Sequence, residues 1–342
     1  MKTTAYLLAA VTAASISLNG QAANWQALPD TAPTPADNPT TQAKVELGKM
    51  LYFDPRLSST GTVSCFSCHN VMEGGDDHRP ISLGVHSQEG GRNAPTVWNA
   101  AFLSTQFWDG RAAQLEDQAK GPITNPIEMG MANLDLAVER IQRIAEYRPY
   151  FEQAFGEKAA VDEDTIAKAI AAYERTLITP NSPYDRFVKG EQSALNATQQ
   201  RGMETFDAVG CTQCHSGANF SGPSLPTGQA FLMKFPLFTE NSYVEQYQLL
   251  ADKGRGEQTG KAEDEHLWRV PTLRNLTYTA PYFHNGSVKS LPEAVRVMGS
   301  TQLNKKLTDQ QTNDIVAFLQ SLTGPFPQQT MPRLPPTPGD ML

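Results

Sequence analysis

"CFSCH" at residues 65–69 and "CTQCH" at residues 211–215 contain all four cysteines of this 342-residue chain. In each stretch two residues separate the cysteines, and a histidine follows the second cysteine. This spacing is typical of c-type haem attachment, in which two thiols bind one porphyrin and the histidine binds its iron. The motifs therefore predict two covalently bound haem c groups, held by Cys65, Cys68 and His69 and by Cys211, Cys214 and His215.

Two other uses of four cysteines remain to be weighed. Disulfides are the ordinary use in an exported protein, and two CxxC halves can also form one zinc site. Neither alternative explains why a histidine follows both cysteine pairs at the same position. Haem attachment is therefore the favoured interpretation.

The first 23 residues have the features of an export signal. Lys2 is followed by the apolar run "AYLLAAVTAASISL" and by the small residues "GQAA". The run is too short to span a bilayer comfortably, so a cleaved leader is favoured over a membrane anchor. No later segment predicts a membrane span. We expect an exported mature chain that begins near residue 24.

The charge balance narrows the range of partners. The chain has 28 Lys and Arg residues against 36 Asp and Glu residues, a formal net charge of −8. An acidic protein of this kind is a poor ligand for nucleic acid. The same charge suits a basic protein partner through electrostatic steering.

Helical periodicity predicts an all-α fold with long loops. The apolar spacing predicts helices over residues 41–53, 133–155, 164–178 and 308–322. The segments before the two haem motifs form a faint internal repeat, since each carries a glycine and then a phenylalanine. This repeat predicts two cytochrome-c-like haem domains.

The proline-rich and polar segments predict the domain boundaries. "TPNSPYDRF" at residues 179–187 is interpreted as a linker. Residues 24–40 are interpreted as a loose arm, and the Pro-rich end as an extended tail. The resulting division is residues 24–187 for the N-terminal domain, 188–325 for the C-terminal domain and 326–342 for the tail.

Each haem has a second axial face, for which the chain offers several side chains. Met298 in "LPEAVRVMGS" is a candidate at the second haem, where a thioether would stabilise reduced iron. The alternative is an ordinary core methionine. The first haem has no obvious methionine ligand, and the nearby candidates are Met72, His78 and His86.

A set of longer motifs resembles one family, the bacterial di-haem cytochrome c peroxidases. Besides the two CxxCH motifs, the matching stretches are "GGRNAPTVWNA", "QFWDGRA", "EDQAKGPITNPIEMG", "VPTLRNLTYTAPYFHNGSV" and "AVRVMG". They follow the family's order and cover nearly all of the mature chain. The resemblance implies a periplasmic enzyme that reduces hydrogen peroxide with electrons from a cytochrome c or a cupredoxin. The resemblance is also compatible with a homodimer.

The resemblance also implies roles for single residues. Met298 matches the methionine ligand of the C-terminal haem, and Trp108 the tryptophan between the two haems. Glu128 matches the acid over the peroxide-binding face, and Gln118 a polar neighbour in that pocket. Without the resemblance, Trp108 would be read as a core residue and Glu128 as a solvated acid. The resemblance further implies a calcium ion bound by Asn93, Thr279 and Pro281, and a C-terminal tail that folds back onto the first domain.

The resemblance leaves two questions open. Many members of the family close the first haem with a histidine, but ungapped alignment places that histidine at Val85, one residue before His86. His86 is therefore a candidate for a switchable ligand, with His78 as a substitute. The second question is the function class. The related tryptophylquinone-forming oxidases share much of the pattern but usually have tyrosine in place of Met298, and a non-enzymatic di-haem electron carrier is the other alternative.

Overall fold

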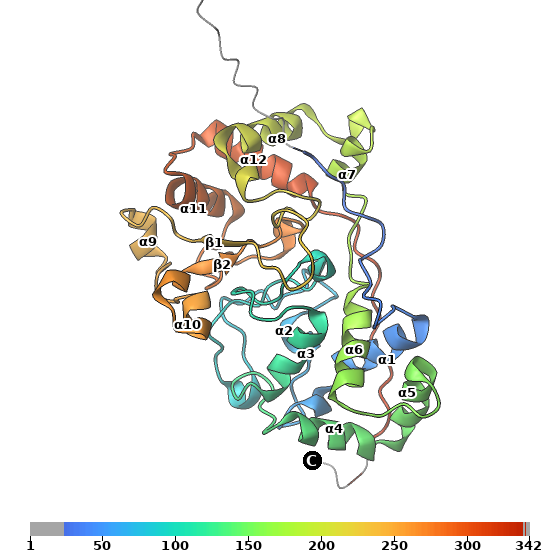
Figure 1. Ribbon diagram of the computed structural model, residues 1–342. Helices are drawn as coiled ribbons and strands as arrows, with labels where there is room; N and C mark the ends of the chain where they lie inside the picture. Colours follow the sequence, from blue (N-terminus) through green and yellow to red (C-terminus); the bar gives the residue numbers. More distant parts are fainter. Residues whose placement is uncertain (1–23, 338, 340–342) are drawn as a thin grey trace, which may run out of the picture.

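The computed structural model describes residues 24–337 and 339, so the proposed export signal at residues 1–23 lies outside the described residues. The described chain is mainly helical, with long loops between the helices (Figure 1). Its one sheet within these residues is an antiparallel pair, β1 (Leu232–Lys234) and β2 (Leu267–Arg269), which places Leu232 opposite Arg269. The all-α prediction is confirmed. Within the same residues we find no helix with the length and hydropathy of a membrane span.

Two separate hydrophobic cores divide the helices into two groups. One core is built from residues between Leu47 and Leu177, and the other from residues between Tyr184 and Leu322. The helices of the first half are α1 (Gln42–Tyr52), α2 (Cys65–Cys68), α3 (Leu115–Thr124), α4 (Leu134–Arg143), α5 (Arg148–Phe155) and α6 (Glu163–Glu174). Those of the second half are α7 (Pro183–Val188), α8 (Ala197–Val209), α9 (Ser242–Gln246), α10 (Arg255–Thr259), α11 (Leu291–Leu303) and α12 (Asp309–Ser321).

The same kind of helix pair organises each core. In the first core α1 packs on α6, and a Cβ atom at Gly48 would lie 1.8 Å from the carbonyl oxygen of Ala169. In the second core α8 packs on α12, and a Cβ atom at Gly202 would lie 1.9 Å from the carbonyl oxygen of Asp314. Only glycine permits such approaches. These are the glycines of the faint sequence repeat, so the repeat reflects a shared packing.

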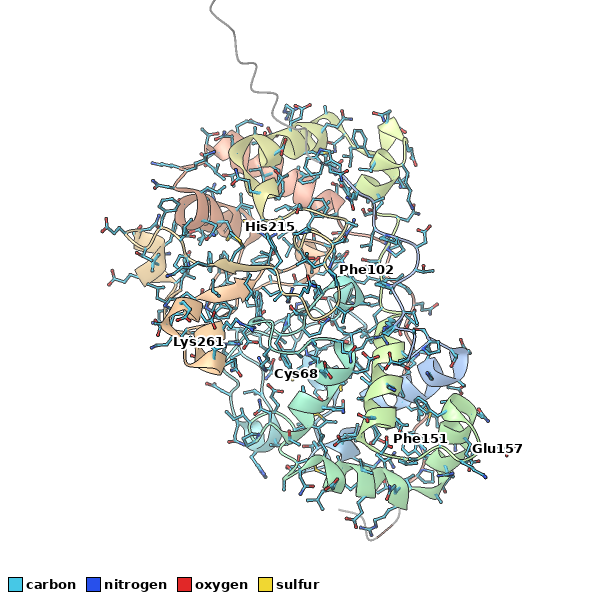
Figure 2. All side chains as sticks on the ribbon, in the orientation of Figure 1. Cys68, Phe102, Phe151, Glu157, His215 and Lys261 are labelled. Atoms are coloured by element: carbon cyan, nitrogen blue, oxygen red, sulfur yellow. The ribbon has the colours of Figure 1, made fainter. Side chains whose placement is uncertain are left out.

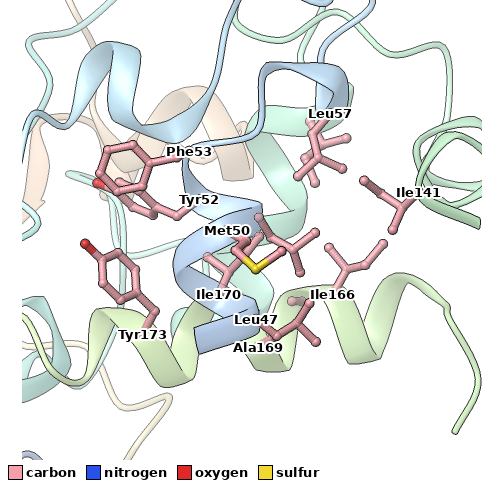
Figure 3. Close-up of a cluster of buried hydrophobic side chains, with 14 of the residues drawn as sticks. Leu47, Met50, Tyr52, Phe53, Leu57, Ile141, Ile166, Ala169, Ile170 and Tyr173 are labelled. Carbon is pink, nitrogen blue, oxygen red and sulfur yellow. The ribbon is translucent and has the colours of Figure 1, made fainter. Parts of the chain in front are cut away.

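Apolar side chains fill the contact between α1 and α6 in the first core (Figure 3). Leu47 and Met50 from α1 meet Ile166 and Ile170 from α6, and all four are buried. Such burial stabilises the fold by about 1.5–3 kcal/mol for each large side chain. This core lies directly behind the first haem motif, because Phe53 at the end of α1 stacks on Phe66 of α2 with ring centroids 4.6 Å apart.

Three of the four predicted helices are single helices, and the fourth is broken. Helices α1, α6 and α12 agree with the predictions for 41–53, 164–178 and 308–322. The predicted helix over 133–155 ends at Arg143, and α5 begins at Arg148 after a short 3-10 turn. Pro149 lies in the first turn of α5 and explains the break, because it has no N–H to donate to the carbonyl of Ala145 and its ring would clash with that carbonyl in a continuous helix.

The segment predicted to be a linker, residues 179–187, contains most of a partly buried helix, α7, instead. Ser182 caps α7 through reciprocal hydrogen bonds with Asp185, and Pro183 occupies the first turn. Asp185 also forms an ion pair with Arg274, with Nη2 and Oδ1 2.8 Å apart and both side chains fully buried. The Ser-Pro signal was therefore that of a helix start rather than of a flexible linker.

Both ends of the described chain cross to the opposite half. Trp25 packs on Tyr184, Phe220 and Phe318 of the second core, so the N-terminal arm is not loose as predicted. The chain after α12 runs down to the first half, where Phe326 contacts Trp98 with ring centroids 5.0 Å apart (Figure 1). These crossings connect the two halves in addition to α7.

Candidate haem centres

The first CxxCH motif lies on a large cavity in the N-terminal half. Cys65, Cys68 and His69 all line it, and α2 places the two thiols one helical turn apart. The His69 ring nitrogen Nδ1 lies 3.0 Å from the carbonyl oxygen of Pro95. Such a bond orients a metal-binding imidazole and leaves Nε2 for the metal. Burial lowers the pKa of His69, which favours the neutral form that ligates iron.

The second motif repeats this arrangement in the C-terminal half. Cys211, Cys214 and His215 line a mainly apolar cavity, and His215 Nδ1 lies 3.0 Å from the carbonyl oxygen of Phe220. Met298 on α11 lines the same cavity. Cys68 and His215 lie in different halves of the molecule, so the two motifs serve separate centres (Figure 2).

The residues present fit haem c better than the two alternatives. All four cysteines are free thiols, each pair beside its own cavity and its own oriented histidine. In the part of the chain that the structure describes, no group of three or more His, Cys, Asp or Glu side chains could hold a metal ion alone. The two motifs therefore do not combine into one zinc site. A porphyrin would supply the remaining iron ligands in each cavity.

Glu128 and Gln118 line the N-terminal cavity together with His69. Gln118 comes from α3, and Glu128 from the loop that follows it. The Val85 amide donates to the carbonyl oxygen of Glu128 at 2.9 Å, which fixes this loop against residues 84–88. Burial raises the pKa of Glu128, and the positive charge of Arg111 lowers it. The cavity thus contains a carboxyl group whose proton is held more tightly than in water.

Trp108 lies in the wall between the two centres. It lines both cavities, and its indole Nε1 donates to the carbonyl oxygen of Asn93 at 2.9 Å. The backbone amide of Arg269 donates to the carbonyl oxygen of Trp108 at 2.8 Å, which ties this loop to β2. That Trp108 lies between two haems stays a prediction.

The structure does not bring His86 to the N-terminal cavity. Its side chain is exposed at a backbone φ of 57°, whereas the preceding Val85 is buried in the first core. His78 is also outside the cavity lining, and its Nε2 lies 2.8 Å from the Glu73 carboxylate. Met72 is exposed. None of the three predicted candidates reaches the face opposite His69 in this conformation.

Asn93, Thr279 and Pro281, the residues expected at calcium, all line the C-terminal cavity beside the boundary of the two halves. The Asn93 side chain donates from Nδ2 to the carbonyl oxygen of Arg79 at 2.7 Å. The structure thus gathers an amide side chain and backbone segments that carry carbonyl oxygens, the oxygen ligands that calcium prefers. Calcium binding stays a prediction.

Three cavity residues were not identified from the sequence. Glu174 is buried, and burial raises its pKa to about 8. His284 stacks on Trp268 with ring centroids 4.1 Å apart, and burial lowers its pKa to about 4. Arg269 lines both cavities. An acid within the apolar run "AIAAYE" was the one available signal for Glu174, whereas nothing in the local sequence marks Arg269 or His284.

The two CxxCH cavities define a di-haem c-type cytochrome, and comparison with known proteins gives the same class. A family model described as di-haem cytochrome c peroxidase matches residues 42–193, and a cytochrome c model matches residues 199–323. Cytochrome c551 peroxidase of Pseudomonas aeruginosa is 43% identical over 322 residues, covering 93% of this chain and 90% of the relative. The chain belongs to the di-haem cytochrome c peroxidase family.

Relatives with other names lie at somewhat lower identity. Methylamine utilization protein MauG of Methylophilus methylotrophus is 35% identical over 324 residues, with 90% of both chains covered. Among solved structures, a MauG-like protein associated with microbial copper homeostasis superimposes with a TM-score of 0.75 at 30% identity. The match covers 89% of this chain and 96% of that one. The family thus includes both peroxidases and MauG proteins.

Proposed function

We propose that the protein is a di-haem peroxidase that reduces hydrogen peroxide to water with electrons from a small redox protein, a cytochrome c or a cupredoxin. The observation that carries the proposal is Glu128, a half-buried acid with a raised pKa in the same cavity as His69. Curated relatives named cytochrome c551 peroxidase, at 42–43% identity, support the same activity.

In the N-terminal cavity, Cys65, Cys68 and His69 would hold the haem at which peroxide binds. A haem held there would supply the redox chemistry for cleavage of the O–O bond. Glu128 takes a proton from one peroxide oxygen and delivers a proton to the other, which is general acid–base catalysis. Gln118 lines the same cavity as a polar neighbour. Overall, one peroxide, two electrons and two protons give two waters.

In the C-terminal cavity, Cys211, Cys214, His215 and Met298 would hold the haem that receives electrons from the donor. A methionine ligand favours the reduced iron, as suits an electron-entry centre. Trp108, in the lining of both cavities, offers a polarisable side chain between them. Electrons would therefore enter at the C-terminal centre, and peroxide would react at the N-terminal centre.

Several further features belong to the proposal. The domains are residues 24–187 and 188–325, with the tail of residues 326–342 on the N-terminal domain, and a calcium ion is bound by Asn93, Thr279 and Pro281. The exported protein acts in the periplasm after the leader is removed, and a homodimer fits the family. The tail is supported by the hydrogen bonds from Arg56 to the Pro335 carbonyl and from Tyr173 to Gln329.

The test is peroxide-dependent oxidation of a reduced donor. The haem-loaded protein is mixed without oxygen with reduced cytochrome c or reduced cupredoxin, and donor oxidation is followed after peroxide is added. We expect two donor molecules to be oxidised for each peroxide consumed. Absence of peroxide-dependent oxidation with either donor would refute the proposal.

The second candidate function is oxidation of a residue in a partner protein. The reason to consider it is the 35% identity to MauG. Met298 argues against it, because the related oxidases usually have tyrosine at this position. A pure electron carrier is the third candidate and requires both irons to keep two protein ligands. Cyanide binding to the partly reduced protein would exclude the carrier.

A further inference from the structure

Arg269 is a buried cation at the wall between the two haem cavities. It is the last residue of β2, only 5% of it is exposed, and it lines both cavities. Its backbone amide donates to Trp108 of the other half. The backbone of Arg269 is therefore hydrogen-bonded to the N-terminal half, and its side chain is buried.

The guanidinium has neutral hydrogen-bond partners only. Nε donates to the carbonyl oxygen of Phe107 at 3.0 Å and Nη1 to that of Val270 at 3.1 Å. Among residues 24–337 and 339, no carboxylate forms an ion pair with it, and no protein acceptor contacts Nη2. Asp109 attracts it electrostatically, but the Asp109 carboxylate already forms ion pairs with Arg92 and Arg111.

An unpaired charge at such a site is costly. Burial lowers the pKa of Arg269 to about 10, so the side chain keeps its charge at neutral pH. Removing an ion from water costs several kcal/mol unless a counter-charge compensates for it. The buried charge of Arg269 would therefore be stabilised by an anion bound beside it.

The C-terminal cavity lacks any other fixed charge. Among the described residues that line it, Arg269 is the only Lys or Arg, and none is Asp or Glu. The N-terminal cavity differs, because Arg92 and Arg111 also line it and acids balance them. A haem brings two propionate carboxylates, and in the C-terminal cavity these would otherwise face mainly apolar side chains.

The geometry points to Arg269 as the counter-charge and hydrogen-bond donor for a propionate of the C-terminal haem. It is a positioning and potential-setting residue, since Nη2 binds the propionate while Nε and Nη1 hold the Phe107 and Val270 carbonyls. The inference rests on haem occupancy of this cavity and not on the peroxidase reaction. One side chain would thus connect the C-terminal haem to the loop that carries Trp108.

The test is the midpoint potential of each haem in Arg269→Gln. A nearby cation stabilises the reduced haem, so its removal should lower the potential of the C-terminal haem. We expect at least a tenfold shift toward the oxidised form, about 59 mV for a one-electron couple. The propionate bending bands of the resonance Raman spectrum, which report hydrogen bonding to propionates, should shift as well. A shift confined to the N-terminal haem, or no shift at all, would overturn the inference.

Two further variants make the test independent of folding. Arg255→Gln is the matched control, because Arg255 also donates to a carbonyl of the same loop, that of Asp109 at 3.1 Å, but lines neither cavity. Its potentials should equal those of the wild type. Arg269→Lys keeps the charge and loses the planar fork. It should keep most of the potential but shift the propionate bands, and unchanged bands in this variant would overturn the inference even if Arg269→Gln failed to fold.

Discussion

Glu128, the proposed acid–base residue, shows how the surroundings of a side chain change its pKa. Burial favours its neutral form, and Arg111 favours its charged form. Arg111 is held in place by Asp109, 2.8 Å from Nη1, and by the face of the Phe107 ring. The balance of burial and charge sets where the acid gives up its proton.

Removing Arg111 should change that balance in a known direction. Glu128 must be deprotonated to accept the first peroxide proton, so activity is lost as pH falls through its pKa. In Arg111→Gln the attraction is absent, the pKa of Glu128 rises further, and the acid limb of kcat/KM moves to higher pH. Lys120→Gln, an α3 change that is not among the causes of the Glu128 shift, should leave the limb in place. A limb that moves to lower pH in Arg111→Gln would contradict this account.

The loop of residues 82–91 carries His86, the candidate for a switchable haem ligand. Its buried residue is Val85, while the adjacent His86 is exposed. The ungapped alignment places the family's histidine at Val85, and a shift of one residue exchanges this buried position for the exposed position of His86, because neighbouring side chains point in different directions. In this conformation the loop presents no imidazole to the N-terminal cavity.

His86→Ala should therefore leave the reaction unchanged. We expect the fully oxidised protein to consume peroxide in its first turnover, at the same rate in wild type and variant, in a stopped-flow experiment. A wild-type lag that prior reduction removes, and that is absent from the variant, would show instead that His86 closes the haem.

Helix α7 is the element that joins the N-terminal arm to the second core. The Asp185 carboxylate accepts from both terminal nitrogens of Arg274, at 2.8 and 3.1 Å, and from the Leu28 amide of the N-terminal arm at 2.9 Å. Because the pair is fully buried, losing one partner leaves an uncompensated charge.

Asp185→Asn should lower the free energy of unfolding by about 3–5 kcal/mol. The measurement is urea unfolding of the haem-loaded protein. Lys189→Met is the matched control, since Lys189 forms an exposed pair with Asp30 and should contribute at most about 1 kcal/mol. Equal effects of the two substitutions would mean that the buried pair does not stabilise this connection.

Features that depend on residues close together in the sequence could be predicted, whereas features that depend on contacts between distant residues could not. The CxxCH motifs could be proposed as haem sites from the sequence because haem attachment requires a short fixed spacing, and α1 and α12 could be predicted because their periodicity is local. Helix α7 was not predicted, because a Ser-Pro pair occurs in linkers as well as at helix starts. Arg269 was not identified from the sequence, because its proposed binding of a haem propionate depends on Phe107 and on two cavities that form only in the folded chain.

At the scale of the whole molecule, two similar halves carry different centres. The pairs α1–α6 and α8–α12 pack through equivalent glycines, yet the linings of the two cavities differ. Met298 lines the C-terminal cavity, whereas Glu128 lines the N-terminal cavity. The arm at Trp25 and the tail at Phe326 each cross to the other half. Trp108 and Arg269 line both cavities and so form part of the wall between them.

The central claim is that peroxide chemistry depends on Glu128 in the N-terminal cavity while both haems remain in place. The most direct measurement is steady-state peroxide turnover of Glu128→Gln with a reduced donor, beside the haem absorption spectrum. Asp117→Asn, an exposed acid on α3, is the control and should behave as the wild type. The account predicts unchanged haem spectra and a loss of turnover of about 10²–10⁴-fold in Glu128→Gln. Near-normal turnover with both haems bound would contradict it.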